Sequence, residues 1–247
     1  MSGEAPGGWG DTLVSAAEDL GIDLTGKSLK YLEIYAGLVR ERASRHGLMS
    51  QKAVVHLDRH LLDAIALCAM LPRDEEKMLR GVDVGSGVGI PGVVVAIVCP
   101  HVHVTLLDAG RRRVEFLTDV AAALPDLGLH PVKIRAEVAG QGVFREVFDF
   151  AVCRAVAPMA ALAELCLPLI RVGGEFLAQK TKKAEREVED ARHAVNVCGG
   201  HVLEPTYYQL VGMEIERMVV RVAKVESTPP LYPRRDGVPQ RRPLISS

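Results

Sequence analysis

The chain has 247 residues, of which 48% are hydrophobic and 25% charged, a composition typical of a globular protein that buries a sizeable core in one or two domains. Its formal net charge is −1, which excludes a global positive excess, so any nucleic-acid binding must come from a local basic surface. The longest apolar run, residues 93–99, is too short to cross a bilayer, and we expect a cytoplasmic protein without a signal peptide.

The first 72 residues predict a frayed end followed by helices. Residues 1–10 are rich in glycine, and we expect them to be disordered. Apolar residues then recur at the spacing of amphipathic helices over 11–20, 29–39 and 53–71. Because these helices precede the first strand, residues 11–72 predict an N-terminal helical cap.

From residue 80 on, strands alternate with helices. The expected strands cover about 81–84, 102–107, 131–135, 147–152, 174–179, 201–209 and 216–224, and the expected helices cover 91–98, 111–124, 158–169 and 182–197. This alternation predicts an α/β domain over residues 73–226, with a mostly parallel sheet covered on both faces. The last two strands connect through Gly212, which indicates a hairpin and an antiparallel strand at that edge. Residues 227–247, rich in proline and arginine, predict an extended tail without a core of its own.

A glycine-rich turn joins the first strand of this domain to its first helix. It reads Asp-Val-Gly-Ser-Gly-Val-Gly-Ile-Pro-Gly over residues 83–92. Gly85, Gly87 and Gly89 lack a Cβ where the backbone must turn sharply and a ligand must come close. Pro91 suits the first helical turn, because its missing N–H would be unpaired there. The turn therefore predicts a nucleotide site.

Two acidic residues bear on which nucleotide binds. Asp83 lies where a diphosphate would approach, and its carboxylate better suits a cationic ligand such as the amino acid end of S-adenosyl-L-methionine. Asp108 ends the second strand and can accept both ribose hydroxyls, a feature that serves NAD and S-adenosylmethionine equally. The residues favour S-adenosylmethionine. A NAD-dependent dehydrogenase and a nucleotide-binding regulatory protein without methyl transfer stay open as alternatives.

Motifs in one order along residues 29–244 resemble those of a single bacterial family. They are Arg59–Asp63, Asp83–Gly92, Leu106–Asp108, Arg112–Leu117, Arg135–Glu137, Arg154–Ala157 and Tyr232–Arg235. Together they resemble the glucose-inhibited division protein B family, whose members methylate guanine N7 in 16S (small-subunit) ribosomal RNA. The resemblance implies a Rossmann-like fold, S-adenosylmethionine as cofactor, and small-subunit ribosomal RNA or the small ribosomal subunit as partner. We expect a monomer.

The resemblance also implies roles for individual residues. The cofactor would be bound by the loop residues Asp83, Gly85, Gly87, Gly89 and Ile90, by Asp108 at the ribose, by Ala136 and Glu137 at the adenine, and by Arg154. The substrate would be faced by Arg154, Lys180 and Arg217. Independently of the resemblance, Arg112 and Arg113 open the helix after Asp108, where cations oppose the helix macrodipole. That placement fits contacts with RNA phosphates or a solvated basic turn, and both interpretations stay open. Guanine N7 carries a lone pair and no proton, so we expect no general base.

Two stretches depart from the family pattern. Residues 47–50 read Gly-Leu-Met-Ser where Asn-Leu-Thr is usual, and Thr181 stands where a glycine usually follows the lysine. No family role is therefore carried over to residues 47–50 or to Thr181.

Histidines and cysteines raise the question of a metal site. His56 and His60 share one helix face at metal-ligand spacing, but Leu57 stands where the metalloprotease pattern requires glutamate. We therefore favour a polar helix face near the cofactor cleft or the RNA, and we expect no metal. The five cysteines fall singly, which predicts reduced, buried thiols and not a disulfide or zinc framework.

Overall fold

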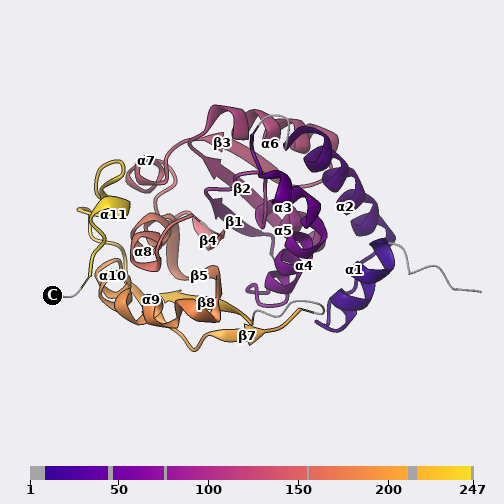
Figure 1. Ribbon diagram of the computed structural model, residues 1–247. Coiled ribbons are helices and arrows are strands. Elements are labelled where there is room, and N and C mark those ends of the chain that lie inside the picture. Colours follow the sequence, from indigo (N-terminus) through magenta and orange to yellow (C-terminus); the bar gives the residue numbers. More distant parts are fainter. Residues whose placement is uncertain (1–8, 44–46, 75–76, 155, 211–215, 246–247) are drawn as a thin grey trace, which may run out of the picture.

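A single twisted sheet forms the centre of the computed structural model, which describes residues 9–43, 47–74, 77–154, 156–210 and 216–245 (Figure 1). Its strands are β1 (Leu79–Val84), β2 (Val102–Asp108), β3 (Leu129–Lys133), β4 (Phe148–Arg154), β5 (Ile170–Thr181), β6 (Gly200–Val202), β7 (Thr206–Tyr208) and β8 (Arg217–Lys224). The strand order is β3-β2-β1-β4-β5-β8-β6, and β7 also pairs with β8. β1 to β5 are parallel, and β8 runs antiparallel to β5, β6 and β7.

This sheet confirms the predicted α/β fold and the antiparallel strand near one edge. Gly212 lies outside the described residues. The predicted strand over 201–209 is two short strands, β6 and β7, which both pair with β8. Parallel strands place their carboxyl ends at one edge of a sheet, and open α/β folds bind ligands at that edge.

Helices cover both faces of the sheet (Figure 1). The first core contains buried residues of α1 (Trp9–Glu18), α2 (Gly26–Leu38), α4 (Leu57–Cys68), α5 (Gly92–Val98) and α6 (Arg111–Ala123). The second core contains buried residues of α7 (Ala136–Gln141), α8 (Met159–Cys166), α9 (Glu185–Asp190) and α10 (Arg192–Val197). The N-terminal helices therefore share one hydrophobic core with α5 and α6.

Several predicted helices differ from those observed. Trp9 and Gly10 belong to α1, so the predicted disorder is wrong at these two residues. The helix expected over 53–71 is broken at His56 into α3 (Gln51–Val55) and α4, because the backbone of His56 (φ −104°, ψ 29°) leaves the helical range. The helix expected over 182–197 is likewise divided into a 3-10 turn (Lys182–Ala184), α9 and α10. α7 was not predicted, because six residues with glycine at position 140 carry too little helical periodicity.

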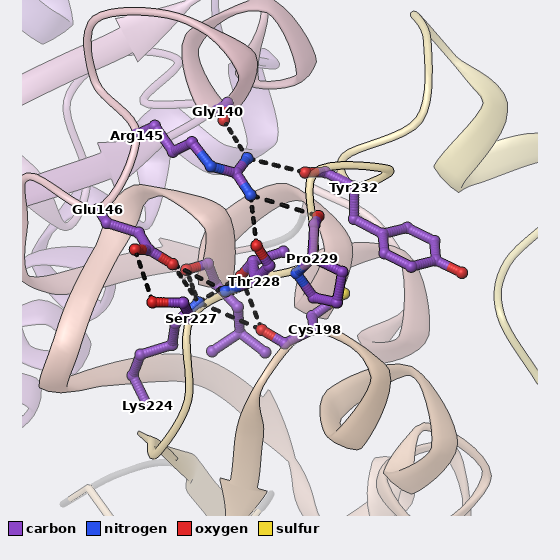
Figure 2. A network of polar contacts seen from close by, with 10 residues as sticks. Gly140, Arg145, Glu146, Cys198, Lys224, Ser227, Thr228, Pro229 and Tyr232 are labelled. Carbon is purple, nitrogen blue, oxygen red and sulfur yellow. Dashed lines mark hydrogen bonds and ion pairs between the residues drawn. The ribbon is translucent and has the colours of Figure 1, made fainter.

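The C-terminal residues fold back onto the domain, so the prediction of an extended tail is wrong. The Arg145 guanidinium donates to the backbone carbonyls of Thr228 at 2.5 Å and Tyr232 at 2.9 Å (Figure 2). Lys224 is fully buried, and its Nζ donates to the carbonyl of Leu167 at 2.8 Å. The segment then reaches α11 (Val238–Arg241). The Arg145 side chain thus satisfies backbone carbonyls of the C-terminal segment, a contact that hydrophobic periodicity does not reveal.

The five cysteines are free and buried, which confirms their predicted state. None of the helices in the described parts of the chain combines the length and apolar character needed to span a bilayer.

Candidate functional site

The glycine turn leaves the carboxyl end of β1 with a backbone that only glycine adopts easily. Gly85, Gly87 and Gly89 have φ angles of +73°, +61° and +97°. A Cβ on Gly89 would lie 2.4 Å from Cγ2 of Val93, so this position has no room for a side chain. Pro91 is the N-cap residue of α5. The helix therefore begins at Gly92, one residue later than predicted.

A cavity of about 520 Å³ opens where this turn meets the ends of β2, β3 and β4. Small-molecule and cofactor sites have volumes of about 300–1,000 Å³, so this cavity is large enough for a nucleotide. The predicted site residues that line it are Gly85, Gly87, Ile90, Asp108, Arg113, Ala136, Glu137 and Arg154. A Cβ on Gly87 would meet no atom closer than 3.9 Å, which leaves its backbone open to a ligand.

Asp108 is fixed at the wall of this cavity by the backbone on either side. Its Oδ2 accepts the N–H of Gly87 at 3.0 Å, and its Oδ1 accepts the N–H of Gly110 at 2.7 Å. Arg113 Nη1 lies 3.5 Å from Oδ2. A carboxylate oxygen can accept about two hydrogen bonds, so Oδ1 keeps room for a ligand hydroxyl, whereas Oδ2 already accepts from Gly87 and Arg113.

Asp83 has a different environment from the one expected. Its side chain is 1% exposed, and its Oδ2 accepts the N–H of Gly92 at 2.9 Å at the start of α5. Burial raises the pKa of Asp83 to about 7. The carboxylate therefore holds the turn against α5, and its contact with a ligand stays a prediction.

Glu137 joins the cavity to the C-terminal segment. Its Oε1 accepts a hydrogen bond from Arg135 Nη2 at 2.9 Å and another from the Gly237 N–H at 2.7 Å. Burial opposes its ionisation, but these hydrogen bonds outweigh that effect and lower the pKa of Glu137. Gln240, further along the same segment, also lines the cavity.

Arg154 and Arg217 meet at a buried carboxylate that the sequence analysis did not assign to the site. Asp63 of α4 is 1% exposed; its Oδ2 lies 3.3 Å from Arg154 Nη1, and its Oδ1 lies 3.6 Å from Arg217 Nε. Tyr208 donates its hydroxyl to Asp63 Oδ1 at 2.6 Å. Burial, with the nearby charge of Arg154, lowers the pKa of His60 to about 4. Asp63 is the last residue of the Arg59–Asp63 motif, and that motif was the available signal.

Other predicted substrate residues lie apart from this cluster. Lys180 Nζ donates to Glu187 Oε1 at 2.8 Å and to the carbonyl of Ala157 at 3.0 Å, and it does not line the cavity. Arg112 is exposed and is also absent from the cavity wall. Their roles toward RNA stay predictions, as do those of Arg113, Arg154 and Arg217.

Two residues that line the cavity come from segments for which no function was predicted from the sequence. Leu48 lies in the loop that departs from the family pattern, and Gln240 lies in α11. Neither carries a motif, because both reach the cavity only through the folding of distant segments. Within the described ranges, no group of three or more metal-ligating side chains is placed to hold an ion.

The sheet order with its antiparallel strand β8 beside β5, the glycine turn and the acidic residue at the end of β2 are together typical of Rossmann-like, S-adenosylmethionine-dependent methyltransferases. Two solved structures have a similar fold. TrmN from Thermus thermophilus gives a TM-score of 0.53 at 15% identity, over 75% of this chain and 52% of that chain. A putative transferase from Pyrococcus horikoshii gives 0.52 at 14% identity, over 71% and 65%.

Sequence comparison defines the family within this class. The family model GidB, rRNA small subunit methyltransferase G, matches residues 28–211. Proteins named ribosomal RNA small subunit methyltransferase G are 37% identical in Staphylococcus saprophyticus, over 91% of this chain and 94% of the relative, and 38% identical in Syntrophomonas wolfei, over 86% and 98%. The chain belongs to the GidB family of methyltransferases.

Proposed function

We propose that this protein transfers the methyl group of S-adenosylmethionine to N7 of a guanine in small-subunit ribosomal RNA. The observation that carries the proposal is the cavity in which Asp108, held by the amides of Gly87 and Gly110, faces the open backbone of the glycine turn. The names of the relatives support the choice of ribosomal RNA. We expect the reaction to take place in the cytoplasm.

The residues of the cavity fit the proposed cofactor. Asp108 would accept the ribose hydroxyls, and Gly87 would let the ligand approach the backbone. Ala136 and Glu137 would contact the adenine. The cofactor, when bound, supplies an electrophilic methyl group on a sulfonium.

The chain needs no general base for this reaction. Guanine N7 presents a lone pair at the major-groove edge and has no proton to lose. The task of the protein is to hold N7 in line with the methyl group, which is an effect of proximity and orientation. Arg154 lines the cavity and carries a positive charge beside it, so we propose that it orients the target nucleotide.

We also propose that residues 11–72 act as a helical cap that completes the site of the domain over 73–226. Leu48 lines the cavity, and Asp63 of α4 reaches Arg154. The cap therefore contributes both to the cavity and to the placement of a substrate residue.

The test is transfer of labelled methyl from S-adenosylmethionine to small ribosomal subunits and, in parallel, to deproteinised ribosomal RNA, both from a strain that lacks this protein. We expect label in 7-methylguanosine after nucleoside digestion. No label on either acceptor, with cofactor binding intact, would refute the proposal in favour of a regulatory nucleotide-binding protein. Binding of NAD with no binding of S-adenosylmethionine would instead support a dehydrogenase.

A further inference from the structure

The C-terminal segment concentrates positive charge in a chain that is otherwise acidic. Residues 227–247 contain four arginines and one aspartate, a net charge of +3, whereas the whole chain has a net charge of −1. This segment is folded against the domain, because Arg145 donates to the carbonyl of Thr228 and Lys224 donates to the hydroxyl of Thr228 (Figure 2). Its arginines are therefore held in place on the surface of the folded protein.

A groove of about 950 Å³ lies between this segment and α7, and it is larger than the cofactor cavity. Besides Arg234, three further arginines line it: Arg235, Arg241 and Arg242. All three are exposed, and within the described parts of the chain none of them forms an ion pair with a carboxylate. Arg241 donates to the carbonyl of Asp236 at 3.3 Å, which leaves its charge uncompensated.

The other charged residues of the groove are already paired. Arg234 binds the buried carboxylate of Glu164, with Nη2 and Oε2 2.6 Å apart. Asp236 Oδ2 lies 3.2 Å from Arg135 Nε, and Arg135 also binds Glu137. The groove therefore presents an excess of positive charge that comes from Arg235, Arg241 and Arg242.

Exposed apolar side chains lie among these arginines. Val138 is 50% exposed and Leu231 is 69% exposed, and both line the groove. Arginines beside exposed apolar side chains suit a nucleic-acid strand. Its phosphates would contact the guanidinium groups, and its sugars or bases would pack against the apolar side chains.

The groove adjoins the cofactor cavity. Glu137 lines both, and Gln240 of α11 lines the cavity while its neighbours in the chain, Arg241 and Arg242, line the groove. α7 and α11 lie on the same side of the molecule, beside α8 (Figure 1). We infer that this groove binds the phosphodiester backbone of the substrate RNA next to the nucleotide that enters the cavity, an inference that rests on the proposed function.

The experiment compares single variants Arg235→Ala, Arg241→Ala and Arg242→Ala with Arg73→Ala. Arg73 is an exposed arginine that precedes β1, at the amino-terminal end of that strand, whereas the cavity lies at the carboxyl ends of the strands. It lines neither the groove nor the cavity. The probe is deproteinised small-subunit ribosomal RNA from a strain that lacks this protein. Its dissociation constant is measured over a series of salt concentrations, and S-adenosylmethionine binding is measured beside it.

Each groove variant should weaken RNA binding about fivefold and reduce the slope of log affinity against log salt by roughly 0.7–0.9, the value for one lost phosphate contact. Cofactor binding and the Arg73→Ala variant should match the wild type. Groove variants that bind and methylate RNA as the wild type does would overturn the inference and leave the proposed function standing. A wild-type protein that methylates no ribosomal RNA would refute the proposed function, while the binding slopes would still report on the groove.

Discussion

Asp63 Oδ2 lies 3.3 Å from Arg154 Nη1, and this contact joins helix α4 to the end of strand β4 at the cofactor cavity. The same carboxylate lies 3.6 Å from Arg217 of β8 and accepts a hydrogen bond from Tyr208 of β7. One buried acid thus holds two arginines that come from distant parts of the chain. We conclude that Asp63 is a positioning residue for both.

The variant Asp63→Asn tests this role, because it keeps the size of the side chain and removes its charge. We expect stability to fall by about 3 kcal/mol, since two cations lose a buried anionic partner. Measured well below the melting temperature, KM for RNA should rise about tenfold or more, while S-adenosylmethionine binding stays within about twofold. The control Tyr208→Phe removes one hydroxyl and keeps both ion pairs, so it should change KM less. An Asp63→Asn protein with unchanged KM for RNA would show a purely structural role.

The raised pKa of Asp83 predicts a pH dependence of stability. Burial raises this pKa from 3.8 to about 7, so the folded protein holds a proton that the unfolded chain releases. The resulting stabilisation is complete below about pH 4 and is lost as the pH rises toward 7. Asp83→Asn cannot titrate, so relative to the wild type it should gain about 3 kcal/mol between pH 5 and pH 8. Urea unfolding of both proteins at pH 5 and at pH 8 measures this. A difference in unfolding free energy between the two proteins that is the same at both pH values would contradict the prediction.

The ion pair between Arg234 and Glu164 predicts a non-additive loss of stability. Glu164 is fully buried, and Arg234 Nε lies 2.9 Å from its Oε1. Arg234→Ala should cost about 3–5 kcal/mol, because it leaves a buried carboxylate without its cation. The double variant Arg234→Ala with Glu164→Gln should lose less than the single variant, since no charge is then stranded. Chemical denaturation of the wild type, Arg234→Ala and the double variant measures their free energies of unfolding. A double variant at least as unstable as Arg234→Ala would refute this account.

Two glycine substitutions should change stability in opposite directions. Gly89→Ala places a Cβ 2.4 Å from Val93 at a φ of +97°, and we expect a loss of about 2–3 kcal/mol together with weaker cofactor binding. Gly37→Ala adds a methyl group within α2 that would meet no atom within 4 Å beyond its chain neighbours and the helix's own backbone, and it should gain about 0.5–1 kcal/mol. Thermal unfolding compares the two, and a neutral Gly89→Ala would contradict the described turn.

The glycine turn and the alternation of strands and helices could be predicted because local patterns specify them. Gly85, Gly87 and Asp108 line the cavity. The two glycines belong to the strand-turn-helix segment of β1 and Asp108 to that of β2, and each of these short segments has a local pattern that the sequence reveals. The breaks at His56 and in the segment 182–197 were missed, because apolar periodicity continues across them.

The role of the C-terminal segment could not be predicted from its composition. Proline and arginine suggest an extended tail, yet Arg145 and Glu164 hold this segment by contacts across 70 or more residues. Asp63 and Gln240 reach the site in the same non-local way, through the packing of α4 and α11. Such contacts depend on the tertiary structure, and no single stretch of sequence contains them.

The central claim is that the cavity beside Asp108 holds the methyl donor. Equilibrium binding of S-adenosylmethionine to the wild type and to Asp108→Asn tests it most directly, with melting temperatures measured on both proteins. The wild type should bind, and the variant should bind about tenfold or more weakly while it remains folded, because a hydrogen bond to a charged group is worth about 1.5–3 kcal/mol. Equal affinity in the two folded proteins, or no binding by the wild type, would contradict the account.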